Sequence, residues 1–268
     1  RDFYPPEMAE QNYIFSVWRS MAEKFGYVEY SASILEYAEL YRSKGSDEIV
    51  NDQMYVFKDK GDREVALRPE MTPTLARMVA AKRPALKFPL RWYSIPNVFR
   101  YERPQRGRRR EHWQLNCDLL GIAGVEAEVE IISLAHSIMK TFGAKDEDFQ
   151  IQLNDRAHSE AEMSKLLKNP SDLTKAMRLI DKVNKIPPED FSAEWQKLSD
   201  KPFAIPAGGQ LNALLSELRK RGIVNAVYTP EVVRGFDYYT GMVFEVFDTN
   251  PENRRALFGG GRYDNLLE

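Results

Sequence analysis

Two runs of alternating polar and apolar residues, joined by an arginine-rich stretch, constrain the fold of this chain more than any other feature. The first run is "LRWYSIPNVFRYE", the second is "EHWQLNCDLLGI", and "RPQRGRRR" connects them. A period of two is typical of strands that bury one face. A basic tract of this kind can also be a localisation signal, but the flanking strands favour the loop of a folded hairpin.

The residues before this hairpin predict a helix, a second hairpin and a second helix. "YPPEMAEQNYIFSVWRSMAEKFGY" indicates a helix over about 6–25, with apolar residues at helical spacing (Ile14, Trp18, Met21, Phe25). "MYVFKDKGDREVALRPE" reads as two strands around a turn. In "TPTLARMVAAK" Thr72 is expected to cap a helix, with Pro73 at its first position. Glu70 is therefore expected where a strand becomes a helix.

The second half of the chain changes character twice. "EAEVEIISLAHSIMKTFG" predicts a helix that ends at Gly143, and residues 157–226 are rich in Lys and Glu and mostly helical in pattern. Strand signals return in "GFDYYTGMVFEVFD", and "ALFGGGRYDNLLE" is expected to pass from a strand into a helix. The prediction is an α+β fold with a mostly antiparallel sheet flanked by helices. Its core would comprise 1–156 and 227–268, with 157–226 as a mainly helical insertion.

Charge and cysteine content narrow the class of protein. The formal net charge is −2, so no overall positive field would hold the chain on a polyanion, which must be gripped locally. The single cysteine (Cys117) allows no internal disulfide, and the three histidines lack zinc-ligand spacing, so we expect a cytoplasmic protein without a protein-anchored metal. No apolar run is long enough for a membrane span.

The second strand of the arginine-rich hairpin has a regular polar face. Alternation puts Trp113, Leu115, Cys117 and Leu119 on one face, and His112, Gln114, Asn116 and Asp118 on the other. The same rule puts Arg100 and Glu102 on one side of the first strand. Such a platform could bind a zwitterionic small molecule together with a phosphate. The commoner outcome of such alternation is the solvent-exposed face of a surface sheet, with Cys117 as a core residue rather than a nucleophile.

Two further stretches could contact a ligand. In "FGGGRYD", glycines would let the backbone approach a ligand, and Arg262 would sit at a helix start that favours an anion. A tight strand-to-helix turn explains the same letters. In "VVRGFDYYTG", Arg234 precedes a strand that carries Tyr238 and Tyr239, and an ion pair with Asp237 is the simpler explanation.

The order of these stretches resembles the histidyl-tRNA synthetases, which are class II aminoacyl-tRNA synthetases. "RDFYPPE" resembles the start of the family, residues from about 8 to 36 its motif 1, and "LRPEMTP" its amino-acid-binding segment. "FRYERPQRGRRREHWQ" is similar to motif 2, "VRGFDYYTG" to the histidyl signature, and "GGGRYDNLL" to motif 3. The resemblance runs nearly end to end.

This resemblance implies a fold, an assembly and a reaction. The fold would be the class II catalytic core, with a homodimer built through motif 1. ATP and L-histidine would give histidyl-adenylate, and the histidyl group would pass to the terminal adenosine of tRNA(His). The family's C-terminal anticodon-binding domain has no counterpart here, so we expect the chain to be a catalytic domain.

The resemblance also implies roles for individual residues. Arg100 and Arg234 would act on the α-phosphate and would be the catalytic residues. Histidine would be bound by these two arginines and by Glu70, Met71, Thr72, Gln114, Asp118, Tyr238 and Tyr239. ATP, with Mg2+ bridging its phosphates, would be bound by Arg100, Glu102, Arg108, Arg110, His112, Gly261 and Arg262. The tRNA acceptor end would contact Arg103, Gln105 and Arg106.

Two departures and one rival activity follow from the same comparison. Bacterial members usually carry Glu where Asp118 stands, and His112 replaces the Phe expected beside adenine. The rival is the catalytically silent paralogue that serves as a regulatory subunit of ATP phosphoribosyltransferase. Loss of catalytic residues would be expected there, whereas Glu70, Arg100, Arg234 and Arg262 are all present.

Overall fold

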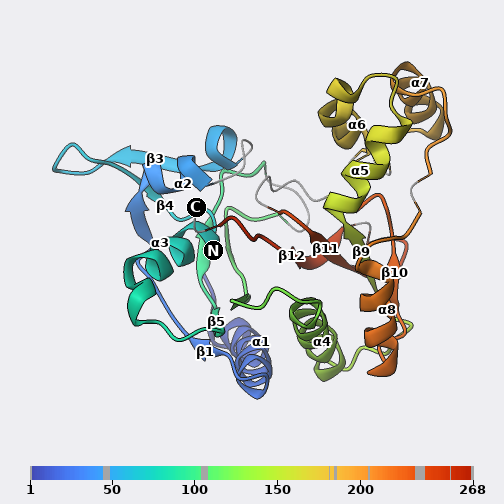
Figure 1. The fold of residues 1–268 in the computed structure, drawn as a ribbon. Helices are drawn as coiled ribbons and strands as arrows, with labels where there is room; N and C mark the ends of the chain where they lie inside the picture. Colours follow the sequence, from blue (N-terminus) through green and yellow to red (C-terminus); the bar gives the residue numbers. More distant parts are fainter. Residues whose placement is uncertain are drawn as a thin grey trace. The chain divides into compact units, whose positions relative to one another are not determined.

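The computed structural model in Figure 1 describes residues 2–44, 49–103, 108–180, 182–183, 186–204, 206–232, 239–253 and 255–266. Its contacts divide the chain into unit 1 (Arg1–Phe142 with Asn265–Glu268) and unit 2 (Gly143–Asp264), and each is described by itself. Among the described residues, no helix combines the length and the apolar character that a bilayer crossing requires.

Unit 1 contains four α-helices among its described residues, two short helical turns and eight strands. The helices are α1 (Pro5–Lys24), α2 (Ala38–Lys44), α3 (Thr72–Lys82) and α4 (Glu126–Thr141), with turns η1 (Ile49–Gln53) and η2 (Arg83–Ala85). The strands are β1 (Val28–Glu29), β2 (Leu35–Tyr37), β3 (Tyr55–Lys58), β4 (Glu64–Leu67), β5 (Leu90–Ser94), β6 (Asn97–Phe99), β7 (Glu111–Trp113) and β8 (Asn116–Leu120). They pair in the orders β1-β5-β8, β2-β4-β3 and β6-β7.

The arginine-rich hairpin is confirmed, but each of its arms is interrupted once. Strands β5 and β8 are antiparallel with Tyr93 opposite Cys117, and β6 and β7 are antiparallel with Val98 opposite His112. The interruption falls at Pro96, which has no N–H to donate to a ladder. The Pro96 carbonyl instead accepts a hydrogen bond from Gln114 N at 3.1 Å, so the two arms stay together across the break.

The predicted alternation of faces in the second arm is also confirmed. Leu115, Cys117 and Leu119 pack against a core formed by α1, α4 and the strand residue Tyr93. Leu120, on the opposite face, packs with Leu75 of α3. The polar face of β8 is therefore the face that α3 covers.

Three helix predictions meet different outcomes. Helix α1 is confirmed, although its buried face runs through Val17, Met21 and Ala22, while Ile14 is exposed. The helix that was expected to end at Gly143 is α4, which ends at Thr141. Thr72 does not cap α3, because it is the first helical residue and Met71 occupies the cap position without a side-chain hydrogen bond.

Unit 2 is a four-stranded sheet with helices. The strands are β9 (Phe149–Asp155), β10 (Ala226–Tyr228), β11 (Met242–Asp248) and β12 (Ala256–Gly261), in the order β10-β9-β11-β12. The helices are α5 (Arg156–Leu166), α6 (Leu173–Ile180), α7 (Pro188–Leu198) and α8 (Leu211–Lys220), with a turn η3 (Pro170–Asp172). Helices α5, α6 and α7 enclose an apolar cluster of their own, centred on Met163, Ile180 and Trp195. Helices α6, α7 and α8 fall within 157–226, the range predicted for the insertion, and α5 begins one residue before it.

The end of unit 2 corrects one expectation. The glycines of "FGGGRYD" belong to strand β12, and Arg262 follows the strand directly. Residues 264–266 form a turn, so within the described part of the chain Arg262 does not stand at a helix start. The helix dipole expected to favour an anion there is not provided by those residues.

Candidate functional site

In unit 1, buried Glu70 directly follows the residue whose carbonyl anchors Arg100. Glu70 occupies the link between β4 and α3, as predicted, and only 3% of the residue is exposed. Arg100 follows β6 and donates from Nε to the carbonyl oxygen of Pro69 at 2.8 Å. One residue earlier, Phe99 N donates to Arg68 O at 2.9 Å. The two segments therefore lie side by side and bring Glu70 and Arg100 into one neighbourhood.

A second arginine, Arg68, links the segments on either side of it by hydrogen bonds. Arg68 is buried and donates to three oxygens: Ala32 O at 2.9 Å, Asn97 O at 2.7 Å and Asn97 Oδ1 at 2.8 Å. Burial lowers the pKa of Arg68, although a guanidinium still stays charged at neutral pH. Sequence reasoning quoted Arg68 within "LRPEMTP" without giving it a role. Its signal was its position two residues before Glu70.

The imidazole of His112 joins the same group from the second arm of the hairpin. Its Nε2 lies 3.3 Å from Nε2 of Gln114. Burial lowers the pKa of His112, and the positive charge of Arg100 lowers it further. The imidazole is therefore neutral at neutral pH and adds no positive charge next to Arg100.

Asp118 lies further along the same polar face. It is 8% exposed and stands opposite Trp92 in the β5–β8 ladder. Burial raises the pKa of Tyr30, and the negative charge of Asp118 raises it further, whereas the hydroxyl of Ser94 opposes this. Tyr30 thus neighbours a residue expected in the imidazole pocket, and sequence reasoning did not single it out.

A cavity of about 120 Å³ opens within unit 1. Tyr30, Arg68, Ser94 and Met71 contribute to its wall. Of the residues expected to bind histidine in this unit, Met71 is among the lining residues and Glu70 is not. The lining is largely polar, because it includes Arg68 and three residues with hydroxyl groups, Tyr30, Ser31 and Ser94.

The arginines of the loop after Arg100 contact a carboxylate and an aromatic ring, whereas Arg100 contacts a backbone carbonyl. Arg108 Nη1 donates to Glu102 Oε2 at 2.8 Å, and Arg110 Nε donates to Glu102 O at 3.3 Å. The guanidinium of Arg110 also stacks 4.2 Å above the ring of Tyr101. Arg103 is exposed, and Gln105 and Arg106 lie outside the described residues.

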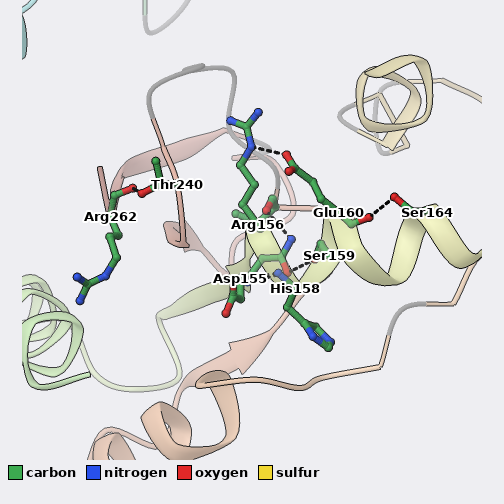
Figure 2. Close-up of polar contacts among 10 residues, drawn as sticks. Asp155, Arg156, His158, Ser159, Glu160, Ser164, Thr240 and Arg262 are labelled. Atoms are coloured by element: carbon green, nitrogen blue, oxygen red, sulfur yellow. Dashed lines mark hydrogen bonds and ion pairs between the residues drawn. The ribbon is translucent and has the colours of Figure 1, made fainter. Parts of the chain in front are cut away.

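In unit 2, Tyr239, Gly261 and Arg262 form the second group of predicted residues. A Cβ on Gly261 would lie 2.6 Å from the ring of Tyr239, so only glycine leaves room for that ring. We expected this glycine to leave space for a ligand. In the structure the space is taken by the side chain of Tyr239. Figure 2 shows Arg262 beside Thr240, and the side chain of Arg262 extends away from Thr240. Arg234 and Tyr238 lie outside the described residues.

Sequence reasoning missed one fully buried amide in unit 2. Asn154 donates from Nδ2 to Pro230 O at 3.2 Å and to Val232 O at 3.0 Å. Its Oδ1 accepts from Ser159 Oγ at 2.7 Å and from Asp155 N at 2.8 Å. Its carbonyl partners lie 76 and 78 residues away in the sequence, so no local pattern marks them.

Cys117 packs against the core on the apolar face of β8. Burial raises the pKa of the Cys117 thiol, and the charge of Asp118 raises it further, so the thiol stays protonated. His158 lies near the start of α5, where its Nε2 is 3.0 Å from Pro206 O. Among the described residues, His, Cys, Asp and Glu form no cluster suited to a metal ion.

Two curated relatives resemble the chain over its whole length. A histidine–tRNA ligase of Leptospira biflexa is 44% identical over 292 aligned positions, which cover all of this chain and 67% of that protein. The histidine–tRNA ligase of Opitutus terrae is 40% identical over 298 positions, covering 68% of that protein. The chain thus spans about two thirds of their length.

Solved structures share the fold. An ATP phosphoribosyltransferase regulatory subunit/histidyl-tRNA synthetase from Bacillus halodurans superposes with a TM-score of 0.85 at 22% identity, covering all of this chain and 75% of that one. A histidine–tRNA ligase subunit from Alicyclobacillus acidocaldarius gives 0.79 at 23% identity and is covered to 88%. The α+β fold of the class II catalytic core is thereby confirmed.

A family model described as histidyl-tRNA synthetase matches residues 1–157 and 147–268. The match spans the polar platform of unit 1 and the β11–β12 end of unit 2. Because this match and the two relatives all extend over the whole chain, the chain belongs to the histidyl-tRNA synthetase family.

Proposed function

We propose that this chain activates L-histidine with ATP to histidyl-adenylate and transfers the histidyl group to the 3′ end of tRNA(His). One observation carries the proposal: Nε of Arg100 donates to the carbonyl of Pro69, the residue before buried Glu70. A carboxylate is suited to the ammonium group of an amino acid. A guanidinium fork is suited to its carboxylate and to a phosphate.

The reaction needs position and charge rather than a protein nucleophile. The histidine carboxylate attacks the α-phosphorus of ATP, the bond to pyrophosphate breaks, and pyrophosphate leaves. A ribose hydroxyl of the terminal adenosine then attacks the adenylate carbonyl, and AMP leaves. Arg100 and Arg234 are assigned to the negative charge that builds on the α-phosphate. Cys117 takes no part, since its buried thiol stays protonated.

Recognition of the imidazole is assigned to Asp118 with Tyr238 and Tyr239. An imidazole has two distinct ring nitrogens, so a carboxylate at one end and a hydroxyl at the other can select it. The hydroxyl of Tyr30 lies close enough to feel the charge of Asp118. Glu70, Met71, Thr72 and Gln114 would hold the rest of the amino acid.

ATP is assigned to Arg100, Glu102, Arg108, Arg110, His112, Gly261 and Arg262. A neutral His112 offers a flat face to adenine without adding charge. Mg2+ would arrive with the triphosphate, because this ion keeps several waters and is usually bound through phosphates. The outer end of the loop, with Arg103, Gln105 and Arg106, would meet the tRNA acceptor end.

A homodimer through motif 1 is part of the proposal. Within motif 1, Val28 of β1 is 65% exposed and Leu35 of β2 is 41% exposed, and Tyr37, which follows the motif directly, is 53% exposed. Exposed apolar surface of this kind is typical of a contact with a second subunit. We assign the protein to the cytoplasm, where ATP and tRNA are available.

The test is amino-acid-dependent exchange between ATP and pyrophosphate, run with Mg2+ and each of the twenty amino acids. Exchange with histidine alone would support the adenylation step and the pocket assignment together. Charging of tRNA(His) transcript would then test the transfer step. Histidine binding without any exchange would contradict the proposal and favour a regulatory, catalytically silent role.

A further inference from the structure

Three residues of unit 2 form a closed hydrogen-bond network around Arg262. Thr240 N donates to Arg262 O at 2.8 Å, and Arg262 N donates to Met242 O at 2.7 Å. The Arg262 side chain donates from Nη1 to Asp264 Oδ1 at 3.2 Å. The backbone of Arg262 is therefore held on both sides, and a carboxylate two residues on engages its guanidinium (Figure 2 shows Thr240 and Arg262).

Thr240 and Asp264 hold each other in turn. Thr240 Oγ1 donates to Asp264 Oδ2 at 3.1 Å and accepts from Asp264 N at 3.0 Å. Because the hydroxyl both donates and accepts, it fixes the backbone and the side chain of Asp264 together. Asp264 then presents its other oxygen to Arg262. The hydroxyl of Thr240 thus controls the carboxylate that orients the arginine.

The methylene part of Arg262 is confined as well. A Cβ on Gly241 would lie 3.2 Å from Cδ of Arg262, closer than side chains usually pack. Glycine at 241 therefore gives the side chain its path across the strand. An arginine loses much rotamer freedom on being fixed, so such confinement matters for the guanidinium at the far end.

Stability does not explain the network. The side chain of Asp264 is 57% exposed, whereas that of Arg262 is 15% exposed. An ion pair with one partner so exposed contributes little to folding, because water screens the charge. The network is specific in geometry and weak in stabilisation, which favours a role in orientation.

We propose that Thr240 and Asp264 are positioning residues that hold the guanidinium of Arg262 in the orientation needed for the triphosphate of ATP. The inference rests on the proposed function, in which Arg262 contacts ATP. Asp264 accepts a hydrogen bond from Nη1 and so fixes the direction in which the guanidinium points. A phosphate then meets a donor set that needs no reorganisation on binding.

The activity test compares Thr240→Val, Thr240→Ser and Asp264→Asn with Glu217→Gln, which removes an exposed ion pair to Lys220 on α8 of the same unit. Thr240→Val and Asp264→Asn should lower kcat/KM for ATP in histidine-dependent exchange by about tenfold, or roughly 1.4 kcal/mol. KM for histidine should stay the same in these variants. Thr240→Ser keeps the hydroxyl and should keep the parent activity, and Glu217→Gln should change nothing. Equal losses in the control, or an unchanged kcat/KM for ATP, would overturn the proposal.

A double-mutant cycle separates positioning from general damage. In an Arg262→Lys background, Thr240→Val should cost less than about twofold, because the group that it positions is already gone. Additive losses in the double variant would mean that Thr240 acts by another route.

A second readout needs no activity. In protein labelled with ¹⁵N-arginine, the guanidinium signal of Arg262, identified by its loss in Arg262→Lys, should show slow rotation about the Nε–Cζ bond. Asp264→Asn and Thr240→Val should speed that rotation, and Glu217→Gln should not. Unchanged rotation would overturn the positioning role even if exchange occurs. A parent protein with slow rotation but no exchange would instead contradict the proposed function alone.

Discussion

The arginines of the loop in unit 1 and Arg262 in unit 2 are assigned to the same ligand but are held in different ways. Arg108 is 44% exposed and meets one carboxylate, Glu102, while Arg110 lies over the ring of Tyr101. Arg262 is 15% exposed and is fixed by two backbone hydrogen bonds and by Asp264. The two loop arginines are exposed, whereas the side chain of Arg262 is mostly buried and the residue is held through both its backbone and its side chain.

The difference shows that an arginine can contribute to binding a polyanion in two ways. An exposed guanidinium contributes attraction over a distance, which salt screens, and it must lose side-chain entropy on contact. A held guanidinium contributes direction, which salt affects less. Arg100 belongs with the held group because the Pro69 carbonyl accepts from its Nε at 2.8 Å.

The largest effect is expected at Arg100. Arg100→Ala should slow single-turnover formation of histidyl-adenylate by about 10²–10³, the range found when one preorganised charge-stabilising group is removed. Arg100→Lys should be nearly as slow, because an ammonium cannot both bond the Pro69 carbonyl and offer a planar fork. A loss of less than tenfold in the Ala variant would place Arg100 among the merely attractive cations.

Asn154 should show the next effect, on stability instead of rate. Asn154→Ala leaves the Ser159 hydroxyl and two carbonyls in a buried place without their partner, which should cost about 2–4 kcal/mol in urea unfolding. The matched control is Asn169→Ala, an exposed cap of η3 that should cost only about 1 kcal/mol. Equal costs would show that burial of Asn154 adds nothing.

The loop arginines should show a moderate effect that depends on salt. Arg108→Ala with Arg110→Ala should raise KM for ATP by about threefold to tenfold at low ionic strength. That loss should vanish near 1 M salt, where the screening length falls to about 3 Å. The loss in Arg262→Ala should persist. If both losses fade alike with salt, the distinction between exposed and held arginines is wrong.

The smallest effect is expected for pH. The pKa of His112 is lowered from 6.5 in the folded state, so the unfolded chain binds the proton more readily. The stability that this provides is fully present above about pH 6.5 and is lost as pH falls below it. His112→Gln should flatten that part of the unfolding curve. An equal slope in both proteins would remove His112 as the cause.

Much of the fold follows from the sequence because its signals are local. The alternation across the arginine-rich hairpin, and the two-run pattern around "DKGD", each predict strands that the structure has. The break at Pro96 and the role of Thr72 escape such reasoning. Both depend on which backbone groups meet across space, as when Gln114 N reaches the Pro96 carbonyl.

The candidate site divides in the same manner. Residues such as Glu70 and Asp118 were identified by alternation and by resemblance to a family, and both are buried where β4 or β8 places them. Arg68 and Asn154 were not, because their partners are distant carbonyl oxygens, which leave no mark in the side-chain pattern. Only a folded chain shows that these two polar groups are satisfied.

Arg68 has a consequence for how the protein could be divided. It sits after the exposed turn at Gly61, yet it donates to Ala32 on one side of that turn and to Asn97 on the other. A chain cut at the turn would place Arg68 and its acceptor Ala32 on separate fragments. Neither fragment alone should fold this part of unit 1, and mixing the two should restore it. Reassembly of such fragments would make adenylation itself a reporter of their complementation.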